Sequence, residues 1–363
     1  MTYKKIFLFT AILLYLLAKG PCSAQEIHQP PALSHHDSWT MIILPDPQTY
    51  MKFERNQPVF DIMLAWISEN KLSMNIELVL CVGDLVEQNE MAVPDGINGN
   101  LSSKEQWEGI SKAFERLDHK IPYILATGNH DYGFKNAEDR RSRFDDYFKK
   151  DRNKLSENML RHVKNNAFDK PSLENAAFEF ISPHGSKFLI FSLEFAPRDA
   201  VVEWAGSISK LPVYSKHHGI LLTHAYMDHQ GNRHVSQRYP LIDVNYGAAL
   251  WEKLIKPSSN FELVFAGHIA DTPEFRGGVA FRSDRNNGNK NVHQMVFNTQ
   301  RLGGGWHGNG GDGWIRILEF LPDGKTVQVS TFSPLFAISP TTRQFAWSRE
   351  PFNEFSFELS EIE

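Results

Sequence analysis

Six short apolar runs, rich in β-branched residues, constrain the fold of this chain more than any other feature. Each run is apolar over most of its consecutive residues, which is typical of strands buried on both faces. Helical patterns stand between several of them, and this alternation predicts a layered α/β fold. The runs are TMIIL (40–44), IELVLCV (76–82), PYILAT (122–127), KFLIFSL (187–193), GILLT (219–223) and FELVFA (261–266).

Two of the intervening segments carry helical signals. In the segment 104–117, Trp107, Ile110 and Phe114 recur at the spacing that places them on one face of a helix. The segment 58–70 opens with Pro58, a residue that suits the first turn of a helix.

The last third of the chain changes character. The apolar segments 291–297, 313–320 and 326–332 follow one another without a helical pattern between them, and Pro322-Asp323-Gly324 is a hairpin turn signal. Runs of consecutive strands predict antiparallel pairing, so the expected sheet is mixed.

Five of the six apolar runs end in polar side chains that could bind a metal ion. Open α/β sheets bind ligands at the carboxyl ends of their strands. Taken singly, an Asp after a strand is most often a helix cap, but five such endings together predict a metal site. The endings are Asp46, Asp84, Asn129-His130-Asp131, His224 and His268.

The order of these motifs resembles the calcineurin-like metallophosphoesterases, in an exported bacterial branch with Asp-x-Gln in the first motif. The resemblance implies an α/β fold, a four-layer α-β-β-α sandwich of two mixed sheets. The motifs are Asp46-x-Gln48, Gly83-Asp84, Gly128-Asn129-His130-Asp131, His224 and Gly267-His268, and VHQMVFNTQ with GGDGWIRILEF closes the pattern.

The resemblance also implies the chemistry, which is hydrolysis of a phosphate monoester or diester by hydroxide generated between two divalent ions, with Mn, Zn or Fe as the expected metals. Asp84 would bridge the two ions. Asn129, His224 and His268 would complete what we call the second half-site. His130 would contact the phosphoryl or leaving-group oxygen, and Asp131 would orient its ring. Glu87 stands where the purple acid phosphatases have tyrosine, which excludes that branch.

The first half-site, which contains Asp46, position 48 and Asp84, departs from the family pattern twice. Gln48 and Ala270 stand where histidines are expected. Gln can offer a carbonyl oxygen to a hard cation, but Ala offers nothing. Three possibilities stay open. His293 could replace the missing ligand if the strand 291–298 runs antiparallel to the one that ends at His268, Asp271 could replace it, or the first ion could bind weakly.

Four further residues are candidates for substrate binding. The glycine-rich stretch 303–314 carries Trp306 and His307, and it is either an ordinary loop or a rim on which Trp306 stacks on a sugar or base. Arg140 and Arg233 are candidate phosphate clamps, with a surface role as the alternative.

The N-terminus has the three-part pattern of a signal peptide, so residues 1–24 are expected to be removed and the protein to be secreted or periplasmic. The apolar core of this segment is too short for a membrane anchor. Only Cys81 would remain, which excludes an intrachain disulfide. The formal net charge of −5, which becomes more negative after cleavage, disfavours duplex nucleic acid as a partner.

The expected mature chain, 25–363, is a single domain that acts on a small phosphate ester. Its core is expected at about 38–335, with surface insertions at about 88–104, 132–175 and 272–290. The oligomeric state is open. The alternative to an enzyme is a pseudoenzyme, a one-metal phosphate- or glycan-binding module that keeps the fold.

Overall fold

Within residues 29–361, the computed structural model contains two seven-stranded sheets. The first has the order β13-β12-β11-β1-β2-β3, and β14 pairs with β12. Its strands β1, β2 and β3 are parallel, whereas β11 and β12 run antiparallel to their neighbours. The bounds are β1 (Trp39–Leu44), β2 (Ile76–Cys81), β3 (Tyr123–Leu125), β11 (Ile315–Phe320), β12 (Thr326–Phe332), β13 (Trp347–Ser348) and β14 (Phe355–Glu358).

The second sheet has the order β4-β5-β6-β7-β8-β10-β9. Its central strands β6, β7, β8 and β10 are parallel, and the edge strands pair antiparallel. The bounds are β4 (Leu160–Asn165), β5 (Pro171–Ile181), β6 (Lys187–Ser192), β7 (His218–Leu222), β8 (Phe261–Ala266), β9 (Val279–Arg285) and β10 (Asn291–Phe297).

The direction of β10 corrects the sequence-based expectation. β10 runs parallel to β8, with His293 opposite Leu263, and not antiparallel to it. This direction results from β9, which lies inside the segment 272–290 that was predicted to be a surface insertion. β9 pairs antiparallel with β10, so the chain runs back along β9 and then returns in the direction of β8.

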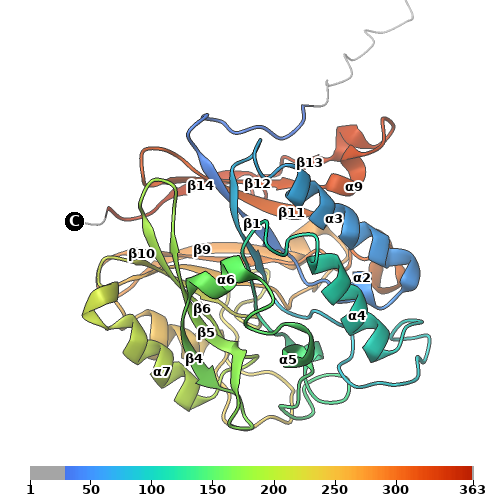
Figure 1. Cartoon of the computed structure of the whole chain (residues 1–363), viewed down its shortest axis with the longest axis horizontal. Helices are drawn as coiled ribbons and strands as arrows, with labels where there is room; N and C mark the ends of the chain where they lie inside the picture. The colour runs from blue at the N-terminus through green and yellow to red at the C-terminus, as the bar shows by residue number, and fades with distance from the viewer. Residues whose placement is uncertain (1–28, 362–363) are drawn as a thin grey trace, which may run out of the picture. The chain divides into compact units, whose positions relative to one another are not determined.

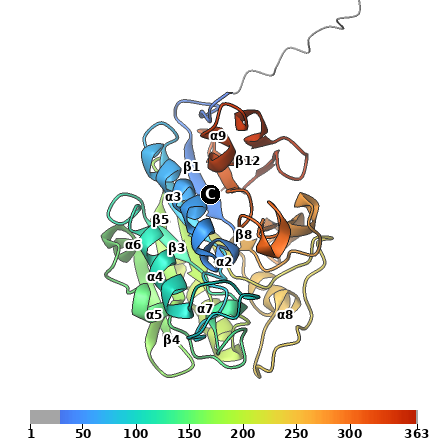
Figure 2. The ribbon, with the colours of Figure 1, turned by 90° about the vertical axis from the view of Figure 1, so that its right-hand side faces the viewer.

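Three apolar clusters define four layers. Alternate residues of β1 illustrate the division, because Met41 and Ile43 face a core between the two sheets while Ile42 and Leu44 face helices. These helices are α3 (Gln57–Glu69) and α4 (Ser103–Phe114), which lie side by side in both views (Figure 1, Figure 2). On the outer face of the second sheet, α7 (Asp199–Ser209) and α8 (Gly247–Leu250) cover a third cluster. The predicted α-β-β-α sandwich is therefore confirmed.

Local sequence explains where the two larger helices of the first layer begin. Ser102 and Glu105 form a reciprocal capping box at the start of α4, and the apolar face predicted from Trp107, Ile110 and Phe114 is buried. Pro58 lies in the first turn of α3. The other short helices and turns are α2 (Gln48–Met51), Glu54–Asn56, Asn129–Asp131, α5 (Phe144–Tyr147), α6 (Lys154–Met159), Pro212–Tyr214, Trp251–Ile255, Phe275–Gly278, Gly305–His307, α9 (Pro334–Ala337) and Arg343–Phe345.

The framework is larger than the core expected at 38–335. β14 extends it to Glu358, and two of the expected insertions contribute strands, since 132–175 contains β4 and 272–290 contains β9. From Pro31 onward the described residues form one compact unit. The proposed signal peptide at 1–24 lies outside the described residues. Between residues 29 and 361, no helix has the length and apolarity needed to cross a bilayer.

A buried ionic cluster ties the amino ends of β7 and β8 together. Glu262 is bonded to the His218 ring at 3.0 Å and accepts from Lys290 Nζ at 2.8 Å and from the Ser360 backbone N at 2.7 Å. Burial raises the pKa of Glu262, but the bonds from His218 and Lys290 outweigh it and lower the pKa to about 2. The carboxylate therefore stabilises the fold above its unfolded pKa of about 4.3, and this contribution is lost as pH falls toward 2.

Glu262→Gln should therefore lower the melting temperature at neutral pH, and the difference from the unaltered chain should shrink as pH falls from about 5 toward 2. Thermal unfolding measured across that range tests this. A difference that stays the same at every pH would contradict an electrostatic role.

Candidate metal centre

Parallel strands of both sheets deliver the predicted site residues to one place. Asp46, Asp84 and Asn129 follow the carboxyl ends of β1, β2 and β3 in the first sheet. His224 and His268 follow the ends of β7 and β8 in the second. Each of these strands ends within four residues of its polar side chain, so the rigid sheets fix where the ligand atoms lie.

Donor atoms of the second half-site converge. Ligand atoms of Asp84, His224 and His268 all lie within 4.8 Å of one another. His224 Nδ1 lies 2.8 Å from the Val82 carbonyl oxygen, which directs Nε2 to the site, 3.1 Å from Asp84 Oδ2. This Nε2 atom is buried and makes no hydrogen bond of normal geometry. Asn129 Oδ1 lies 2.8 Å from His268 Nδ1. A carboxylate, an amide oxygen and two imidazoles suit a zinc-like ion.

Two glycines of the motifs lie so close to candidate ligands that a side chain would not fit there. A Cβ on Gly128 would lie 2.2 Å from Asp84 Oδ1, and one on Gly267 would lie 2.0 Å from Asp46 Oδ1. Two of the candidate ligand residues also hold left-handed backbone, since φ is 53° at Asp84 and 75° at His268. Such strain is retained where the surroundings hold a functional geometry.

The site concentrates three carboxyl groups that are shielded from water, those of Asp46, Asp84 and Asp131. Burial raises the pKa of Asp84, but His224 and His130 outweigh it and lower the pKa to about 2. Burial lowers the pKa of His224, but Asp84 and Asp46 raise it to about 9. Burial raises the pKa of Asp46 and of Asp131 well above the ordinary value, and Asp84 adds to both shifts. Buried carboxylates of this kind are stabilised by bound cations.

The first half-site has two oxygens that fit a cation. Asp46 Oδ2 accepts from the His268 backbone N at 3.0 Å and from Asn298 Nδ2 at 2.6 Å. Asp46 Oδ1 and Gln48 Oε1 are buried and make no hydrogen bond. Because a buried polar atom without a partner is costly, these two oxygens fit the coordination of an ion.

His293 is not part of this site. It stands near the start of β10, at the end of the strand away from Asn298, because β10 runs parallel to β8. Its Nδ1 lies 2.7 Å from Ser283 Oγ, its Nε2 lies 2.9 Å from the Glu358 carbonyl oxygen, and its ring stacks on Phe357 at 4.3 Å. The suggestion that His293 replaces the missing ligand was therefore wrong.

Asp271, the second possible replacement, is engaged elsewhere. Its carboxylate forms an ion pair with the His229 ring. Because neither His293 nor Asp271 replaces the missing ligand, weak binding of the first ion is the remaining possibility of the three.

Asn298 is a site residue that the sequence reading missed. It directly follows β10, just as the other site residues follow their strands. Its Oδ1 accepts from the Gln300 backbone N at 3.0 Å, which orients Nδ2 toward Asp46. The signal was present in VHQMVFN, but the assumed antiparallel direction put this end of the strand away from the site.

Asn298→Ala should lower the affinity of the first half-site for its ion by about 10- to 100-fold, because loss of a residue that orients a metal ligand has an effect of this size. Titrating the metal-free variant with Mn²⁺ measures this loss. The second half-site serves as the internal control and should keep its ion. Unchanged Mn²⁺ affinity would show that Asp46 needs no such support.

His130 lies beside the ligands, but Asp131 does not orient its ring. The His130 backbone N donates to Asp84 Oδ1 at 2.9 Å, and the ring Nδ1 lies 2.6 Å from the Glu87 carbonyl oxygen. Asp131 instead accepts from the backbone N atoms of Gly128 and Val86, at 2.8 and 3.1 Å. Asp131 does not reach the His130 ring, because the helical turn Asn129–Asp131 directs its carboxylate to the backbone N of Gly128, the residue that caps this turn.

Arg140 is a structural residue and not a phosphate clamp. Its guanidinium lies 3.5 Å from the buried Glu194 carboxylate. Its Nη1 donates to the Phe195 carbonyl oxygen, and its Nη2 donates to those of Ala196 and Asp243.

Arg233 is also engaged in structural contacts. It donates to Asp284 Oδ2 at 2.6 Å and to Gln294 Oε1 at 2.8 Å. Its guanidinium carbon lies 3.9 Å from the centroid of the Trp251 ring. These contacts hold Arg233 against β9 and β10, so the clamp interpretation is not supported.

The glycine-rich loop packs against the segment that follows Gln48. Thr49 Oγ1 donates to the Gly310 carbonyl oxygen at 2.8 Å, and the Gly313 backbone N donates to Tyr50 Oη at 3.0 Å. Trp306 is 38% exposed, and Lys52 Nζ lies 5.2 Å from its ring centroid. The loop therefore lies next to the first half-site.

Lys52 connects that loop to the His130 side of the site and was also missed. Its side chain is buried, and Nζ lies 3.4 Å from Glu87 Oε1. His307 contacts the same segment, since its carbonyl oxygen accepts from Arg55 Nη2 at 2.7 Å and its ring lies 5.8 Å from that of Phe53. A lone lysine after a helix gives no signal in the sequence.

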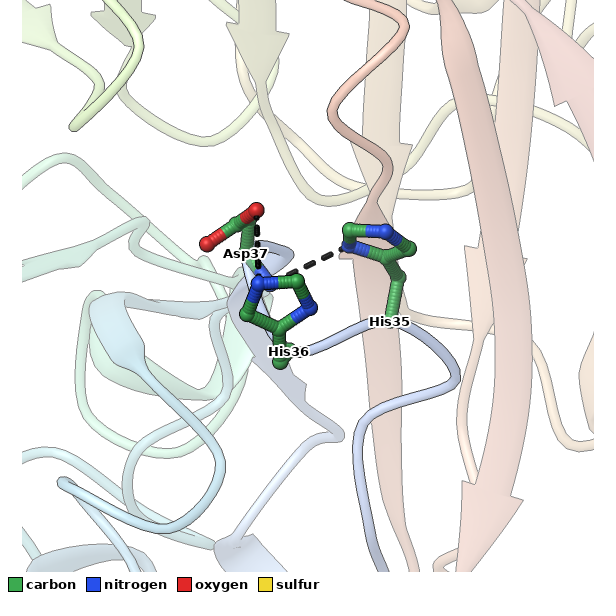
Figure 3. Close-up of side chains that lie close together, drawn as sticks. All are labelled: His35, His36 and Asp37. Atoms are coloured by element: carbon green, nitrogen blue, oxygen red, sulfur yellow. Dashed lines mark hydrogen bonds and ion pairs between the residues drawn. The ribbon is translucent and has the colours of Figure 1, made fainter.

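A second cluster of possible metal ligands lies before β1. His35, His36 and Asp37 are consecutive and exposed, with His36 Nε2 3.0 Å from Asp37 Oδ2 and the two rings 4.6 Å apart (Figure 3). All three side chains are open to solvent, and none has a buried support. We assign no role to this cluster, but it could take up metal ions in a binding experiment.

Comparisons with known proteins identify the family of this chain. The family model for the calcineurin-like phosphoesterases matches residues 40–271, and the chain belongs to that family. Uncharacterized protein YvnB of Bacillus subtilis (strain 168) is 28% identical over 310 residues, which are 84% of this chain and 20% of that protein. The chain thus spans about a fifth of the length of this relative.

One solved structure, described as GAP50, the anchor in the inner membrane complex of Plasmodium, is similar over 89% of each chain. Its TM-score is 0.41 and its sequence identity is 10%, so no function follows from the likeness.

Proposed function

We propose that this chain hydrolyses a phosphate ester with two divalent ions, one in each half-site. Family membership supports the class of reaction. The observation that carries the proposal is the convergence of Asp84, His224 and His268 within 4.8 Å at the carboxyl ends of strands from both sheets. Asn129 and Asp46 complete the two sets of donors, and Asp84 stands between them.

The bound ions would lower the pKa of a water molecule and neutralise charge on the phosphoryl group. Residues of the chain hold that arrangement. Val82 fixes the His224 ring, and the His268 backbone N and Asn298 fix Asp46, so each ligand is oriented by a second contact. Such support raises the precision of a catalytic site.

His130 is positioned to serve the leaving group. A carbonyl oxygen can only accept, so the Glu87 contact requires the proton on Nδ1 of His130. Nε2 is then the nitrogen that gains and loses a proton. In its protonated form the ring can donate that proton to the departing oxygen of the ester.

His130→Ala should leave the metal content unchanged and lower turnover by about 10²- to 10⁴-fold, with the largest loss for esters of poorly acidic alcohols. A series of aryl and alkyl phosphates measures the dependence. His229→Ala, which removes a histidine paired with Asp271 at the surface, is the control. An equal loss for every leaving group would argue for an electrostatic role without proton donation.

The substrate class and the compartment are also proposals. A small phosphate ester, either monoester or diester, is the substrate that we propose, and the leader sequence supports export to a secreted or periplasmic location. The departures at Gln48 and Ala270 favour one rival, a binding module that carries a single metal ion and has no turnover.

A substrate panel separates these functions. Aryl monoesters, aryl diesters, nucleotides and phospho-sugars should be tested with Mn²⁺, Zn²⁺, Fe²⁺ and Mg²⁺, and with His224→Ala as the control. Turnover of one class that His224→Ala abolishes supports the enzyme. Binding of phosphate or sugars without turnover by any metal-loaded sample would establish the rival.

A further inference from the structure

The two half-sites offer different chemistry to a metal ion. We infer that the first half-site of this chain is an all-oxygen site for a hard divalent cation such as Mn²⁺ or Mg²⁺, whereas the second is a histidine site for a zinc-like ion. The inference rests on the proposed function only in taking both half-sites as metal sites.

The donors of the first half-site are all oxygens. Asp46 Oδ1 and Gln48 Oε1 are buried without hydrogen-bond partners, and both side chains are at most 1% exposed. Asp84, which the family resemblance assigns as the shared ligand, lies 3.1 Å from His224 in the second half-site, and its charge also acts on Asp46. Carboxylate and carbonyl oxygens favour Mg²⁺, Ca²⁺ and Mn²⁺.

Neither His293 nor the His268 ring supplies the missing nitrogen ligand. Ala270 has no donor in its side chain, and its carbonyl oxygen accepts from Arg301 Nη1 at 2.8 Å. His293 is held at the other end of β10 by Ser283 and the Glu358 carbonyl. The His268 ring contacts Asn129, in the second half-site.

The neighbouring contacts preserve this oxygen environment. Asn298 and the His268 backbone N both donate to Asp46 Oδ2, which leaves Oδ1 as the oxygen for the ion. Because Ala270 supplies no donor, the first half-site has three protein donors, Asp46, Gln48 and Asp84. The second has four, Asp84, Asn129, His224 and His268, so the first ion should bind more weakly than the second.

The second half-site differs from the first because it contains imidazole nitrogens. His224 presents an unpartnered Nε2 beside Asp84, and His268 lies within the same 4.8 Å cluster. Imidazole donors raise the affinity for Zn²⁺ relative to Mn²⁺ far more than oxygen donors do. A single amide-to-imidazole change at position 48 should therefore alter the selectivity of the first half-site.

The test uses the full chain, stripped of metal, with His35→Ala and His36→Ala to remove the exposed cluster. One equivalent of Zn²⁺ is added, and Mn²⁺ is then titrated while the free Mn²⁺ signal is followed by electron paramagnetic resonance. We expect one tightly held Zn²⁺ and one more weakly bound Mn²⁺. Two zinc ions of equal affinity in this background would overturn the inference.

Three substitutions at one position sharpen the result. Gln48→Ala should weaken Mn²⁺ binding at least about tenfold, and Gln48→Glu, which is nearly isosteric, should tighten it by a similar factor. Gln48→His should instead raise the affinity of this half-site for Zn²⁺ and leave that for Mn²⁺ nearly unchanged. Mn²⁺ affinity that is equal in Gln48→Ala and the unaltered background would remove Gln48 from the ligand set.

These readouts do not depend on turnover. Metal binding as expected without hydrolysis of any ester would refute the proposed function and leave the inference standing. Hydrolysis by a chain with two equal zinc sites would do the reverse. Thermal unfolding of each metal-free variant shows whether the substitution disturbs the fold.

Discussion

His224→Ala is expected to lose the ion of the second half-site and nearly all turnover, a fall on the order of a thousandfold or more. His224 is fully buried, and its Nε2 lies beside Asp84 with no other partner. The Val82 carbonyl oxygen holds the ring in this orientation through Nδ1. The metal content of the purified variant and its turnover on an aryl phosphate measure both effects.

His218→Ala is the matched control, because this buried histidine begins β7, the strand that His224 follows, and lies at the end away from the site. It should lower stability by breaking the contact with Glu262, yet keep the metal content and the turnover of the folded molecules. Full activity with unchanged metal content in His224→Ala would contradict the assignment of His224 as a ligand.

Asp46→Asn should produce effects of opposite sign on activity and on stability. The amide keeps the shape of Asp46 and can still accept from the His268 backbone N. It removes the charge that holds the first ion, so turnover should fall by about a hundredfold or more. In the metal-free chain, Asp46 lies among the buried carboxylates Asp84 and Asp131, and neutralising one of them should raise stability by about 1 kcal/mol.

Three measurements separate these effects. Turnover and Mn²⁺ uptake should fall, zinc in the second half-site should stay, and the metal-free variant should melt at a temperature equal to or above that of the unaltered chain. Loss of both ions, or a clearly less stable metal-free chain, would show that Asp46 supports the fold and not mainly the first ion.

The strand ends explain how much of this site could be predicted from the sequence. Continuous apolar runs that stop at a polar residue identify both the buried strands and the side chains at their carboxyl ends. This rule placed Asp46, Asp84, Asn129, His224 and His268 without any three-dimensional information. The complete burial of β1 follows from the same runs, because both faces of a central strand are covered.

The same rule gave a wrong result for β10, because the direction of this strand could not be predicted from its own sequence. β9 is a short edge strand with polar residues at 282–285, and its sequence resembles a surface loop. If β9 is taken for a loop, β10 is expected to run antiparallel to β8, which would put His293 near the site. Because β9 is a strand, β10 runs parallel to β8, and Asn298 lies near the site instead of His293. Pairing between strands far apart in the sequence, and not local preference, decides this point.

Long charged side chains were the other source of error. Arg140 and Arg233 stand nine residues after site motifs, but their guanidinium groups reach carbonyl oxygens and carboxylates in other parts of the fold. Asp131 illustrates the same problem at short range, because its carboxylate caps the turn that contains it. Composition and spacing carry no information about such partners.

Hydrolysis of an aryl phosphate by the chain before and after metal removal tests the central claim most directly. The chain is stripped with a chelator, and the rate is then measured as Zn²⁺ and Mn²⁺ are added back. We expect no turnover in the stripped chain, recovery that needs both ions, and no recovery in His224→Ala. Turnover that survives complete removal of metal, or a chain that holds both ions and hydrolyses no phosphate ester, would contradict the account.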